Sequence, residues 1–224
     1  MINLFIGNKN YSTWSMRPWL VLRYFNIEFN EHLIPFDDFK LESEFKQHIF
    51  KINPTGKVPA LQHDGLLVWD SLAICEYLAE QFPQKHLWPE NKAQRARARS
   101  ISAEMHSGFA ILRSTCEMNI EADLVEIGQQ LWHDNPQLQS DVQRIEKIWS
   151  ERPDVDGFLC GAFSIADAFY APVVMRFVSY GLPTTELSQG YIEKMLQVPV
   201  LQQWIQEAKQ EHMFVECEEP YRSK

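Results

Sequence analysis

The sequence predicts an α/β domain with a mixed four-stranded sheet, followed by an all-α domain that forms a helical bundle. Two observations support this division. Up to residue 83, short apolar runs alternate with helical patterns in the order β-α-β, then α, then a β-hairpin, then α. After residue 91 no strand pattern remains, and apolar residues recur at helical spacing. We therefore expect domains at residues 1–83 and 92–224, joined by a linker at residues 84–91.

The first β-α-β unit begins with an apolar strand at residues 2–6, which ends at Gly7. Residues 28–35 form an expected second strand with partial alternation of apolar side chains. Between the strands, a polar loop leads into a helix. Ser15 is its expected N-cap, because Pro18 is tolerated only in the first helical turn. A right-handed crossover of this kind makes the two strands parallel.

The end of the α/β domain contains a predicted hairpin. Residues 41–52 are expected to be helical, and two short strands follow at residues 58–62 and 66–69. The Asp-Gly pair between these strands is typical of a tight turn, which adds antiparallel pairing to the sheet. A helix over residues 71–81 closes the domain, because Asp70 is a good N-cap before an apolar helical pattern.

The second domain shows only helical patterns. Three helices are expected first, at residues 93–115, 122–133 and 138–149. Ser164 and Asp167 then form a capping-box pattern. The helix behind it, at residues 165–178, is apolar nearly all round, which places it at the buried centre of the domain. Pro172 predicts a kink or an early end of this helix, and a last helix opens at Pro199.

Composition excludes several classes of partner. The 224 residues carry a net charge of −9, which argues against nucleic acids and anionic membranes. The sequence shows no signal-peptide pattern and no apolar run of the ~18 residues that a membrane span needs. The four cysteines are widely spaced without a C-x-x-C pair, so we expect a reducing, cytoplasmic environment. No metal site is expected, because the histidines lack the spacing of metal ligands.

Residues 53–61, Asn-Pro-Thr-Gly-Lys-Val-Pro-Ala-Leu, combine a turn with a strand start that Pro59 interrupts. Because proline cannot donate a backbone hydrogen bond, backbone groups near Val58 stay unpaired and are free to bind a peptide-like ligand. The helix start at Asp70 and Ser71 offers free N–H groups and a positive dipole end, which suit a carboxylate. Together these segments predict a site for a small peptide with a free α-carboxylate.

The two segments Asn-Pro-x-Gly-Lys-Val-Pro-Ala-Leu and Asp-Ser-x-Ala-Ile-x-Glu-Tyr-Leu resemble the glutathione-binding half of the glutathione S-transferase superfamily. Residues 163–168 are similar to the buried helix start in the second domain of that family. The resemblance implies a cytosolic, bacterial-looking member near the zeta and omega classes, with a thioredoxin-like N-terminal domain and a helical-bundle C-terminal domain. It also implies a cis Pro59, glutathione as the co-substrate, and a homodimer.

The superfamily reaction needs the glutathione thiol as a thiolate, which a hydroxyl donor near a helix N-terminus can stabilise. Ser12 lies five residues before Arg17, at the position where the cysteine-containing omega and zeta classes place their cysteine. Ser12 is therefore our first candidate for the catalytic hydroxyl, while Tyr11, Thr13 and Ser15 stay open as alternatives. A serine at this position argues against thiol–disulfide exchange through a protein thiol.

The resemblance also implies which residues bind glutathione. The backbone of Val58 would pair with the cysteinyl unit, and Asp70 and Ser71 would hold the γ-glutamyl end. Lys57 is a candidate partner of the glycyl carboxylate. Arg17 is either the buried partner of a carboxylate or part of the field that stabilises the thiolate. A second-substrate pocket is expected between the domains, with four candidate wall residues: Trp14, Phe109, Met118 and Phe214.

We therefore expect a glutathione transferase that adds the activated thiol to a small hydrophobic electrophile, the chemistry of detoxification. Two alternatives stay open. One is a non-catalytic glutathione-binding or interaction module, and the other is a glutathione-dependent isomerase similar to maleylacetoacetate isomerase. The zeta class has Ser-Ser-Cys where this chain has Asn10-Tyr11-Ser12, which favours the transferase.

Overall fold

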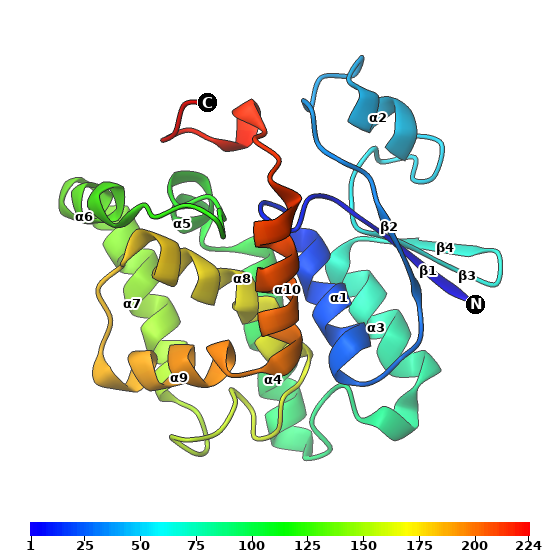
Figure 1. Ribbon diagram of the computed structural model, residues 1–224. Helices are drawn as coiled ribbons and strands as arrows, with labels where there is room; N and C mark the ends of the chain where they lie inside the picture. The colour runs from blue at the N-terminus through cyan, green and yellow to red at the C-terminus, as the bar shows by residue number, and fades with distance from the viewer.

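A four-stranded sheet forms the N-terminal part of the computed structural model, which describes all residues 1–224 (Figure 1). Its strands are β1 (Ile2–Ile6), β2 (Asn30–Leu33), β3 (Ala60–His63) and β4 (Leu66–Trp69), in the spatial order β2-β1-β3-β4. Strand β1 pairs in parallel with β2 and antiparallel with β3, and β3 pairs antiparallel with β4. The predicted mixed sheet is confirmed. Alternate side chains of β1 are buried in the apolar core, which explains the apolar run in the sequence.

Helix α1 (Thr13–Tyr24) begins earlier than the sequence suggested. Its N-cap is Ser12 rather than Ser15, and Pro18 therefore lies inside the helix. The amide of Ser12 donates to the carbonyl of Asn8 (2.8 Å), which closes the preceding loop into a tight turn. This turn brings the chain into helical conformation directly after Ser12, so the prediction that Ser15 caps the helix is wrong.

The other helices are α2 (Glu44–Ile49), α3 (Ser71–Gln81), α4 (Lys92–Ser107), α5 (Ala110–Thr115), α6 (Val125–Asp134), α7 (Pro136–Ser150), α8 (Ile165–Tyr180), α9 (Glu186–Leu196) and α10 (Pro199–Glu211), with 3-10 turns η1 (Pro83–Lys85) and η2 (Glu216–Glu218). Helix α9 was not predicted. The helix expected at residues 93–115 is divided into α4 and α5, because Phe109 adopts a left-handed conformation with φ of 53°. A left-handed residue interrupts the helical hydrogen-bond ladder.

Helix α8 is the buried centre of the helical part, as its all-round apolar pattern predicts. The capping box of Ser164 and Asp167 is present, and Asp167 also accepts hydrogen bonds from the amide of Leu159 (3.0 Å) and the hydroxyl of Tyr191 (3.1 Å). The helix continues through Pro172 to its end at Tyr180, so the predicted early end is wrong. Packing on all sides of α8 outweighs the one hydrogen bond that proline removes.

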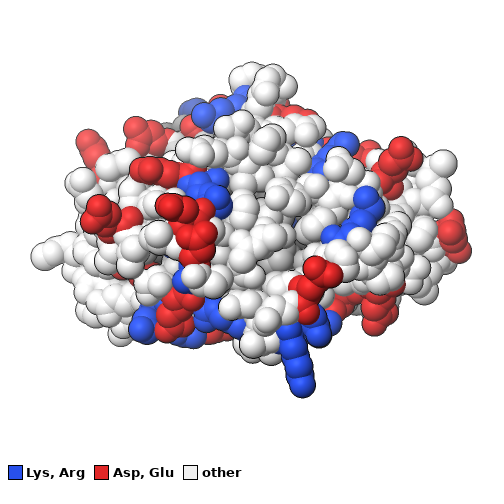
Figure 2. Space-filling view, turned by 90° about the horizontal axis from the view of Figure 1, so that it is seen from below, with Lys and Arg blue, Asp and Glu red and all other residues white.

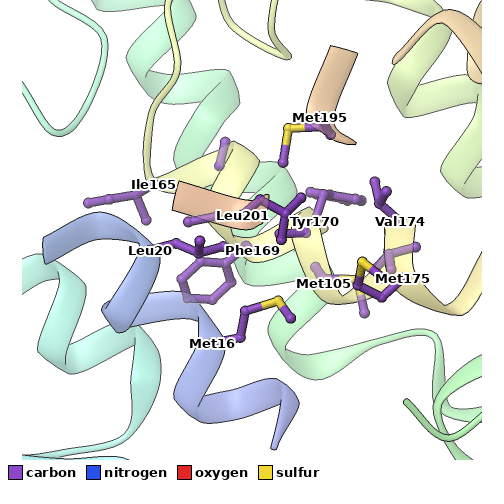
Figure 3. Packing of buried hydrophobic residues seen from close by; sticks show 14 of the residues in the cluster. Met16, Leu20, Met105, Ile165, Phe169, Tyr170, Val174, Met175, Met195 and Leu201 are labelled. Carbon is purple, nitrogen blue, oxygen red and sulfur yellow. The ribbon is translucent and has the colours of Figure 1, made fainter. Parts of the chain in front are cut away.

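The two parts share one apolar core, because α1 packs along α8 (Figure 3). Met16 and Leu20 of α1 gather with Phe169 of α8 at this contact, and all three side chains are fully buried. Lys9 adds a polar link, since its Nζ pairs with Glu207 of α10. These contacts place the loop between β1 and α1 at the junction of the two parts.

Charged side chains of both signs are interspersed on the end of the molecule opposite α2, and no continuous basic patch is seen on that face (Figure 2). Together with the net charge of −9, this distribution makes the face a poor surface for nucleic acids or anionic membranes. None of the helices combines the length and the hydropathy that crossing a membrane requires.

Candidate active site

Two adjoining cavities lie between the sheet and the helical part. The first, of about 370 Å³, is lined mainly by the turn at residues 53–59 and the start of α3. The second, of about 440 Å³, is lined by residues 11–14, where the β1–α1 loop enters α1, by residues 36–46 and 56–58, and by the helical part. Trp14, Lys57 and Val58 line both cavities, so the two are neighbours that share a wall. Their volumes are in the range of small-molecule sites.

Val58 presents unpaired backbone in the first cavity. It precedes β3 through a cis peptide bond to Pro59, as the resemblance implied. Neither its amide nor its carbonyl has a hydrogen-bond partner within the protein. The turn before it is held by Asn53, whose Nδ2 donates to the carbonyl of Lys57 (2.7 Å). An extended peptide can therefore pair with Val58 through both backbone groups.

The start of α3 offers a second set of binding groups in the same cavity. Asp70 caps the helix, because its Oδ1 accepts from the amides of Leu72 (2.8 Å) and Ala73 (3.2 Å). Ser71 is 1% exposed, and its Oγ has no hydrogen-bond partner. The Ser71 amide is also unpaired, as the first N–H of a helix normally is. A buried hydroxyl and a free amide at a helix start form a donor pair that suits a carboxylate.

His106 of α4 also lines the first cavity, although no sequence motif marked it. Its Nε2 lies 3.2 Å from Oδ2 of Asp70, and its ring packs edge-on against Trp14. Burial lowers the pKa of His106, and the Asp70 carboxylate opposes this effect. His106 thus links the helical part to the cap of α3. Sequence reasoning missed the contact because it exists only once α4 has packed beside α3.

Three of the four candidate hydroxyl residues line the second cavity: Tyr11, Ser12 and Thr13. Ser12 is 5% exposed, and its Oγ donates to Oγ of Ser15 (2.7 Å). Ser15 is fully buried and does not line the cavity. The hydroxyl of Thr13, which is 8% exposed, makes no hydrogen bond within the protein. Ser12 and Thr13 are therefore the residues whose hydroxyls can reach a ligand in this cavity.

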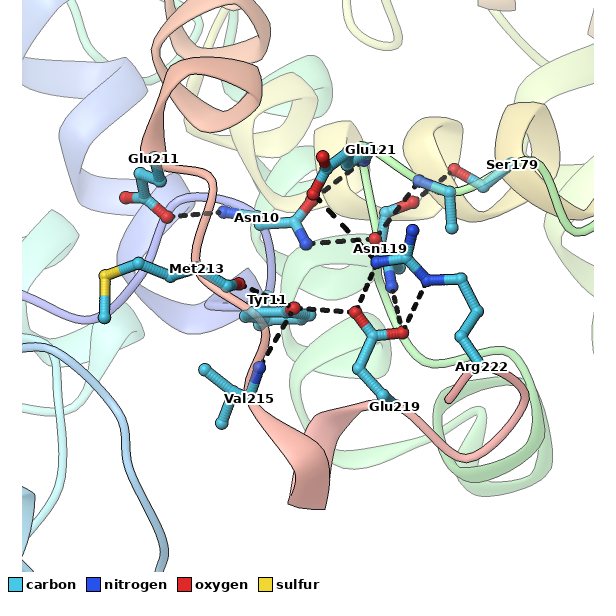
Figure 4. Close-up of polar contacts among 11 residues, drawn as sticks. Asn10, Tyr11, Asn119, Glu121, Ser179, Glu211, Met213, Val215, Glu219 and Arg222 are labelled. Atoms are coloured by element: carbon cyan, nitrogen blue, oxygen red, sulfur yellow. Dashed lines mark hydrogen bonds and ion pairs between the residues drawn. The ribbon is translucent and has the colours of Figure 1, made fainter. Parts of the chain in front are cut away.

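The hydroxyl of Tyr11 is occupied by the C-terminal tail (Figure 4). It donates to Glu219 (2.7 Å) and accepts from the amide of Val215 (3.4 Å). Glu219 is 6% exposed, and it also accepts from Nδ2 of Asn119 (2.8 Å) and from Arg222. Burial, followed by the hydrogen bond to Glu219, raises the pKa of Tyr11 to about 12. The tail thus fixes the loop and leaves the Tyr11 hydroxyl without a free donor.

The second cavity has aromatic and cationic walls. Phe36, Phe39 and Phe45 pack edge to face, with ring centroids 4.9, 5.1 and 5.8 Å apart. The helical part contributes Arg113 and Arg176. Of the four wall residues expected from the sequence, Trp14 and Met118 line the cavity, whereas Phe109 and Phe214 line neither cavity. Phe109 is buried in the apolar core at the start of α5.

Arg17 is buried behind Trp14 without a carboxylate partner. Arg17 is 1% exposed, and its Nε and Nη1 have no hydrogen-bond partner. Its guanidinium lies 4.2 Å from the ring centroid of Trp14 and 4.6 Å from that of Phe169. Burial lowers the pKa of Arg17 to about 9. The interpretation of Arg17 as the buried partner of a carboxylate is therefore wrong, and Arg17 acts as a positive charge behind the site.

Protein thiols do not line either cavity, because Cys75, Cys116 and Cys160 are buried elsewhere and Cys217 is exposed on the tail. No group of three or more His, Cys, Asp or Glu side chains is arranged to hold a metal ion. The groups that the cavities offer to a ligand are hydroxyls, free backbone groups, three carboxyl groups (Asp70, Glu117 and Glu218) and several cations.

Comparison with known proteins agrees with this architecture. Models of the glutathione S-transferase N-terminal and C-terminal domains match residues 11–81 and 112–207. The maleylacetoacetate isomerase of Rattus norvegicus is 30% identical over 169 residues, which cover 74% of this chain and 73% of that protein. A probable maleylacetoacetate isomerase of Caenorhabditis elegans is 35% identical over 106 residues, so the match spans about half (47%) of either protein.

Among solved structures, a glutathione transferase homolog from Burkholderia with bound glutathione is 24% identical, with a TM-score of 0.69 over 93% of this chain and 98% of that chain. At this identity the likeness concerns the fold, which is a thioredoxin-like N-terminal domain with a mixed sheet and a helical C-terminal domain. The two domain models match the chain in the family's order, and the rat relative aligns over nearly three quarters of its length. This chain therefore belongs to the glutathione S-transferase superfamily.

Proposed function

We propose that this protein is a glutathione transferase that activates the glutathione thiol for attack on a small electrophile. The observation that carries the proposal is that the unpaired backbone of Val58 and the free donors of Ser71 line one cavity, which adjoins a second one. Backbone pairing and carboxylate recognition at a helix start are what a γ-glutamyl tripeptide requires. Family membership and the glutathione bound to the Burkholderia homolog support the same ligand.

Each end of glutathione has a proposed partner. Val58 binds the cysteinyl unit through its amide and carbonyl. The γ-glutamyl carboxylate accepts from the amide and the hydroxyl of Ser71, and the amino group lies near the carboxylate of Asp70. Lys57, which lines both cavities, pairs with the glycyl carboxylate. In this arrangement the thiol lies where the two cavities meet, beside Ser12.

Ser12 is the proposed catalytic hydroxyl. Its Oγ, at the N-cap of α1, would donate to the glutathione sulfur instead of Ser15. The helix N-terminus and the buried charge of Arg17 add positive potential, so the thiol pKa falls below its ordinary value of about 8.5. The thiolate sulfur then bonds to the electrophilic carbon, and the leaving group departs with its electron pair. The contribution of the protein is positioning together with stabilisation of the thiolate.

A glutathione-dependent isomerase is the second candidate, and the similarity to the rat maleylacetoacetate isomerase favours it. In that reaction the thiolate adds to a conjugated diacid, the bond rotates, and glutathione is released unchanged. A non-catalytic binding module would use the same binding groups without turnover. The three functions differ in a measurable way, because only the transferase consumes glutathione in step with its second substrate.

The proposal includes a homodimer in a reducing cytoplasm. All four cysteines are free thiols, as such a compartment favours. On the edge strand β4, Leu66 is 51% exposed, and a second copy of the chain would cover it. Analytical ultracentrifugation at micromolar concentration tests this part of the proposal, which a monomer would contradict.

Calorimetric titration with glutathione, beside a conjugation assay with 1-chloro-2,4-dinitrobenzene, tests the function in the wild type, Ser12→Ala and Thr13→Val. We expect all three proteins to bind glutathione and only Ser12→Ala to lose turnover. Loss of turnover only in Thr13→Val would move the catalytic role to Thr13. Binding without turnover in the wild type would favour the binding module or a narrow isomerase. No binding at all would contradict the roles of Val58, Asp70 and Ser71.

A further inference from the structure

The second cavity is cationic in a protein that is otherwise acidic. The chain has a net charge of −9, yet four basic residues line this cavity: Lys46, Lys57, Arg113 and Arg176. None of the four is paired with a carboxylate, whereas basic residues elsewhere are, such as Arg144 with Glu104 and Arg97 with Glu151. Arg17 is also unpaired and lies against Trp14, but it does not line the cavity. Unpaired cations gathered at a cavity indicate an anionic ligand.

Backbone carbonyls hold three of these cations, Lys46, Arg113 and Arg176, in place without neutralising them. Arg176 is 5% exposed, and its Nε and Nη1 donate to the carbonyls of Cys116 (2.7 Å) and Pro172 (3.4 Å). Its Nη2 has no partner within the protein. Arg113 and Lys46 likewise donate to backbone carbonyls. A carbonyl carries no net charge, so the positive charge of each side chain remains available to an anion.

Two glutamate side chains also line the cavity, Glu117 and Glu218, and neither pairs with a basic side chain. Burial raises the pKa of both carboxyl groups, that of Glu218 to about 7. Each is therefore neutral over a wider range of pH than an ordinary glutamate. Even with both ionised, the cations that line the cavity outnumber them.

The apolar wall of the cavity is aromatic. Phe36, Phe39 and Phe45 form a cluster of three rings in mutual edge-to-face contact, which we call the phenylalanine shelf. Nζ of Lys46 lies 5.4 Å from the ring centroid of Phe45 and 6.0 Å from that of Phe39, so a cation borders the shelf. Such a surface favours contact with another aromatic ring, and the neighbouring charge favours an anionic substituent on that ring.

We propose that the second substrate is an aromatic electrophile that carries a carboxylate. This inference rests on the proposed transferase function and names the substrate class of its second cavity. The ring packs on the phenylalanine shelf, and the carboxylate binds Arg113 and Arg176. In the reaction, the glutathione sulfur bonds to the ring carbon that carries a halide, and the halide leaves with the electron pair of the broken bond. The carboxylate takes no part in bond making.

A matched pair of substrates tests the proposal: 4-chloro-3,5-dinitrobenzoate and its neutral amide, 4-chloro-3,5-dinitrobenzamide. Each rate is divided by the uncatalysed rate with glutathione. We expect kcat/KM to be about tenfold higher for the benzoate, because only its carboxylate is negatively charged and can form an ion pair with an arginine. The difference should lie mainly in KM. Equal values for the two substrates would overturn the proposal.

Two variants locate the effect. Arg113→Met should lower kcat/KM for the benzoate far more than for the amide, which brings the ratio close to one. Arg99→Met is the matched control, since Arg99 is paired with Glu76 outside both cavities and its loss changes the net charge equally. We expect it to preserve the ratio. An equal loss on both substrates in Arg113→Met would mean that Arg113 acts on the thiolate, which contradicts the proposal.

Calorimetry with the unreactive 3,5-dinitrobenzoate and 3,5-dinitrobenzamide separates the substrate class from the function. Tighter binding of the benzoate, weakened by salt and by Arg113→Met, would support the anion site. Equal binding of the two compounds would overturn the proposal, even in a protein that binds glutathione and turns over. Tighter benzoate binding by a protein that binds no glutathione would support the anion site and overturn the transferase function.

Discussion

The two cavities of the candidate active site are built in different ways, although they share Trp14, Lys57 and Val58. The first consists largely of backbone groups and a helix cap from two short stretches, residues 53–59 and 69–71. The second consists of side chains from the β1–α1 loop, from residues 36–46, from α5 and its following loop, from α8 and from the tail. The proposed glutathione site is therefore encoded locally, whereas the proposed site of the second substrate depends on how distant segments pack.

If this comparison is correct, substitutions at the first cavity should weaken glutathione binding and leave the choice of second substrate unchanged. Substitutions around the second cavity should change the choice of second substrate and leave glutathione binding unchanged. The four changes below test the separation, beginning with the largest expected effect.

Asp70→Ala removes both the cap of α3 and the proposed partner of the glutathione amino group. We expect the affinity for glutathione to fall roughly 100-fold, because a hydrogen bond between charged groups contributes about 1.5–3 kcal/mol. The free energy of unfolding should fall by about 1 kcal/mol from the lost cap. Calorimetry and urea denaturation measure the two effects.

The matched control for Asp70→Ala is Asn91→Ala. Asn91 caps α4 in the same way, accepting from the amides of Ala93 (2.9 Å) and Gln94 (3.1 Å). We expect a similar loss of stability and an unchanged affinity for glutathione. Equal affinities of Asp70→Ala and Asn91→Ala would show that Asp70 is a structural cap only.

Glu219→Leu tests whether catalysis depends on the tail. The change leaves Nδ2 of Asn119 and the guanidinium of Arg222 without the carboxylate that they share, while the Tyr11 hydroxyl keeps only the carbonyl of Met213 (3.0 Å) as an acceptor. We expect the protein to be destabilised by about 2 kcal/mol. Because Tyr11 directly precedes Ser12, the loosened loop should lower kcat, while glutathione affinity stays close to that of the wild type. Glu216→Leu, an exposed position on the same tail, is the control. Full kcat in a destabilised Glu219→Leu would limit the tail to a structural role.

Ser71→Ala should weaken glutathione binding about tenfold, since one hydrogen bond to a charged carboxylate is lost. The free energy of unfolding should not fall, because the Ser71 hydroxyl is buried without a partner. Thr185→Ala provides the contrast, since Thr185 caps α9 and accepts from the amide of Ser188 (3.4 Å). The free energy of unfolding of Thr185→Ala should fall by about 1 kcal/mol, and its affinity for glutathione should not change. A marked loss of stability in Ser71→Ala would contradict the binding role.

Glu218→Gln should have the smallest effect, and that effect depends on pH. Burial, followed by the charge of Glu117, raises the pKa of Glu218 from 4.5 to about 7. A carboxyl group whose pKa is higher in the folded protein stabilises the fold at pH values below its pKa in the unfolded protein. This stabilisation is lost as the pH rises through the pKa in the folded protein. As the pH rises from 4.5 to about 7, the free energy of unfolding of the wild type should fall by about 1 kcal/mol relative to that of Glu218→Gln. This value is smaller than the full pKa shift implies, because the side chain is only partly buried and solvent screens its charge. Parallel stability profiles of the two proteins would exclude this account.

The sequence predicted the fold correctly wherever the signal is local. The β3–β4 hairpin, the start of α3 at Ser71 and the capping box at Ser164 all form as expected. The errors concern the boundaries of helices. Ser12 rather than Ser15 caps α1, and the long helical pattern after the linker breaks at Phe109. An apolar periodicity continues through such a break, so the pattern alone does not reveal it.

The sequence by itself determined the backbone features of the first cavity, namely the turn that leads to Val58 and the cap at Asp70. Capping and turn preferences act within about four residues, so the amino acids at those positions are sufficient to predict them. Only the tertiary structure decided that His106 reaches Asp70, that Glu219 occupies the Tyr11 hydroxyl, and that unpaired arginines surround one cavity. Those contacts join segments distant in sequence, and they form only because burial of the shared apolar core brings the helices together.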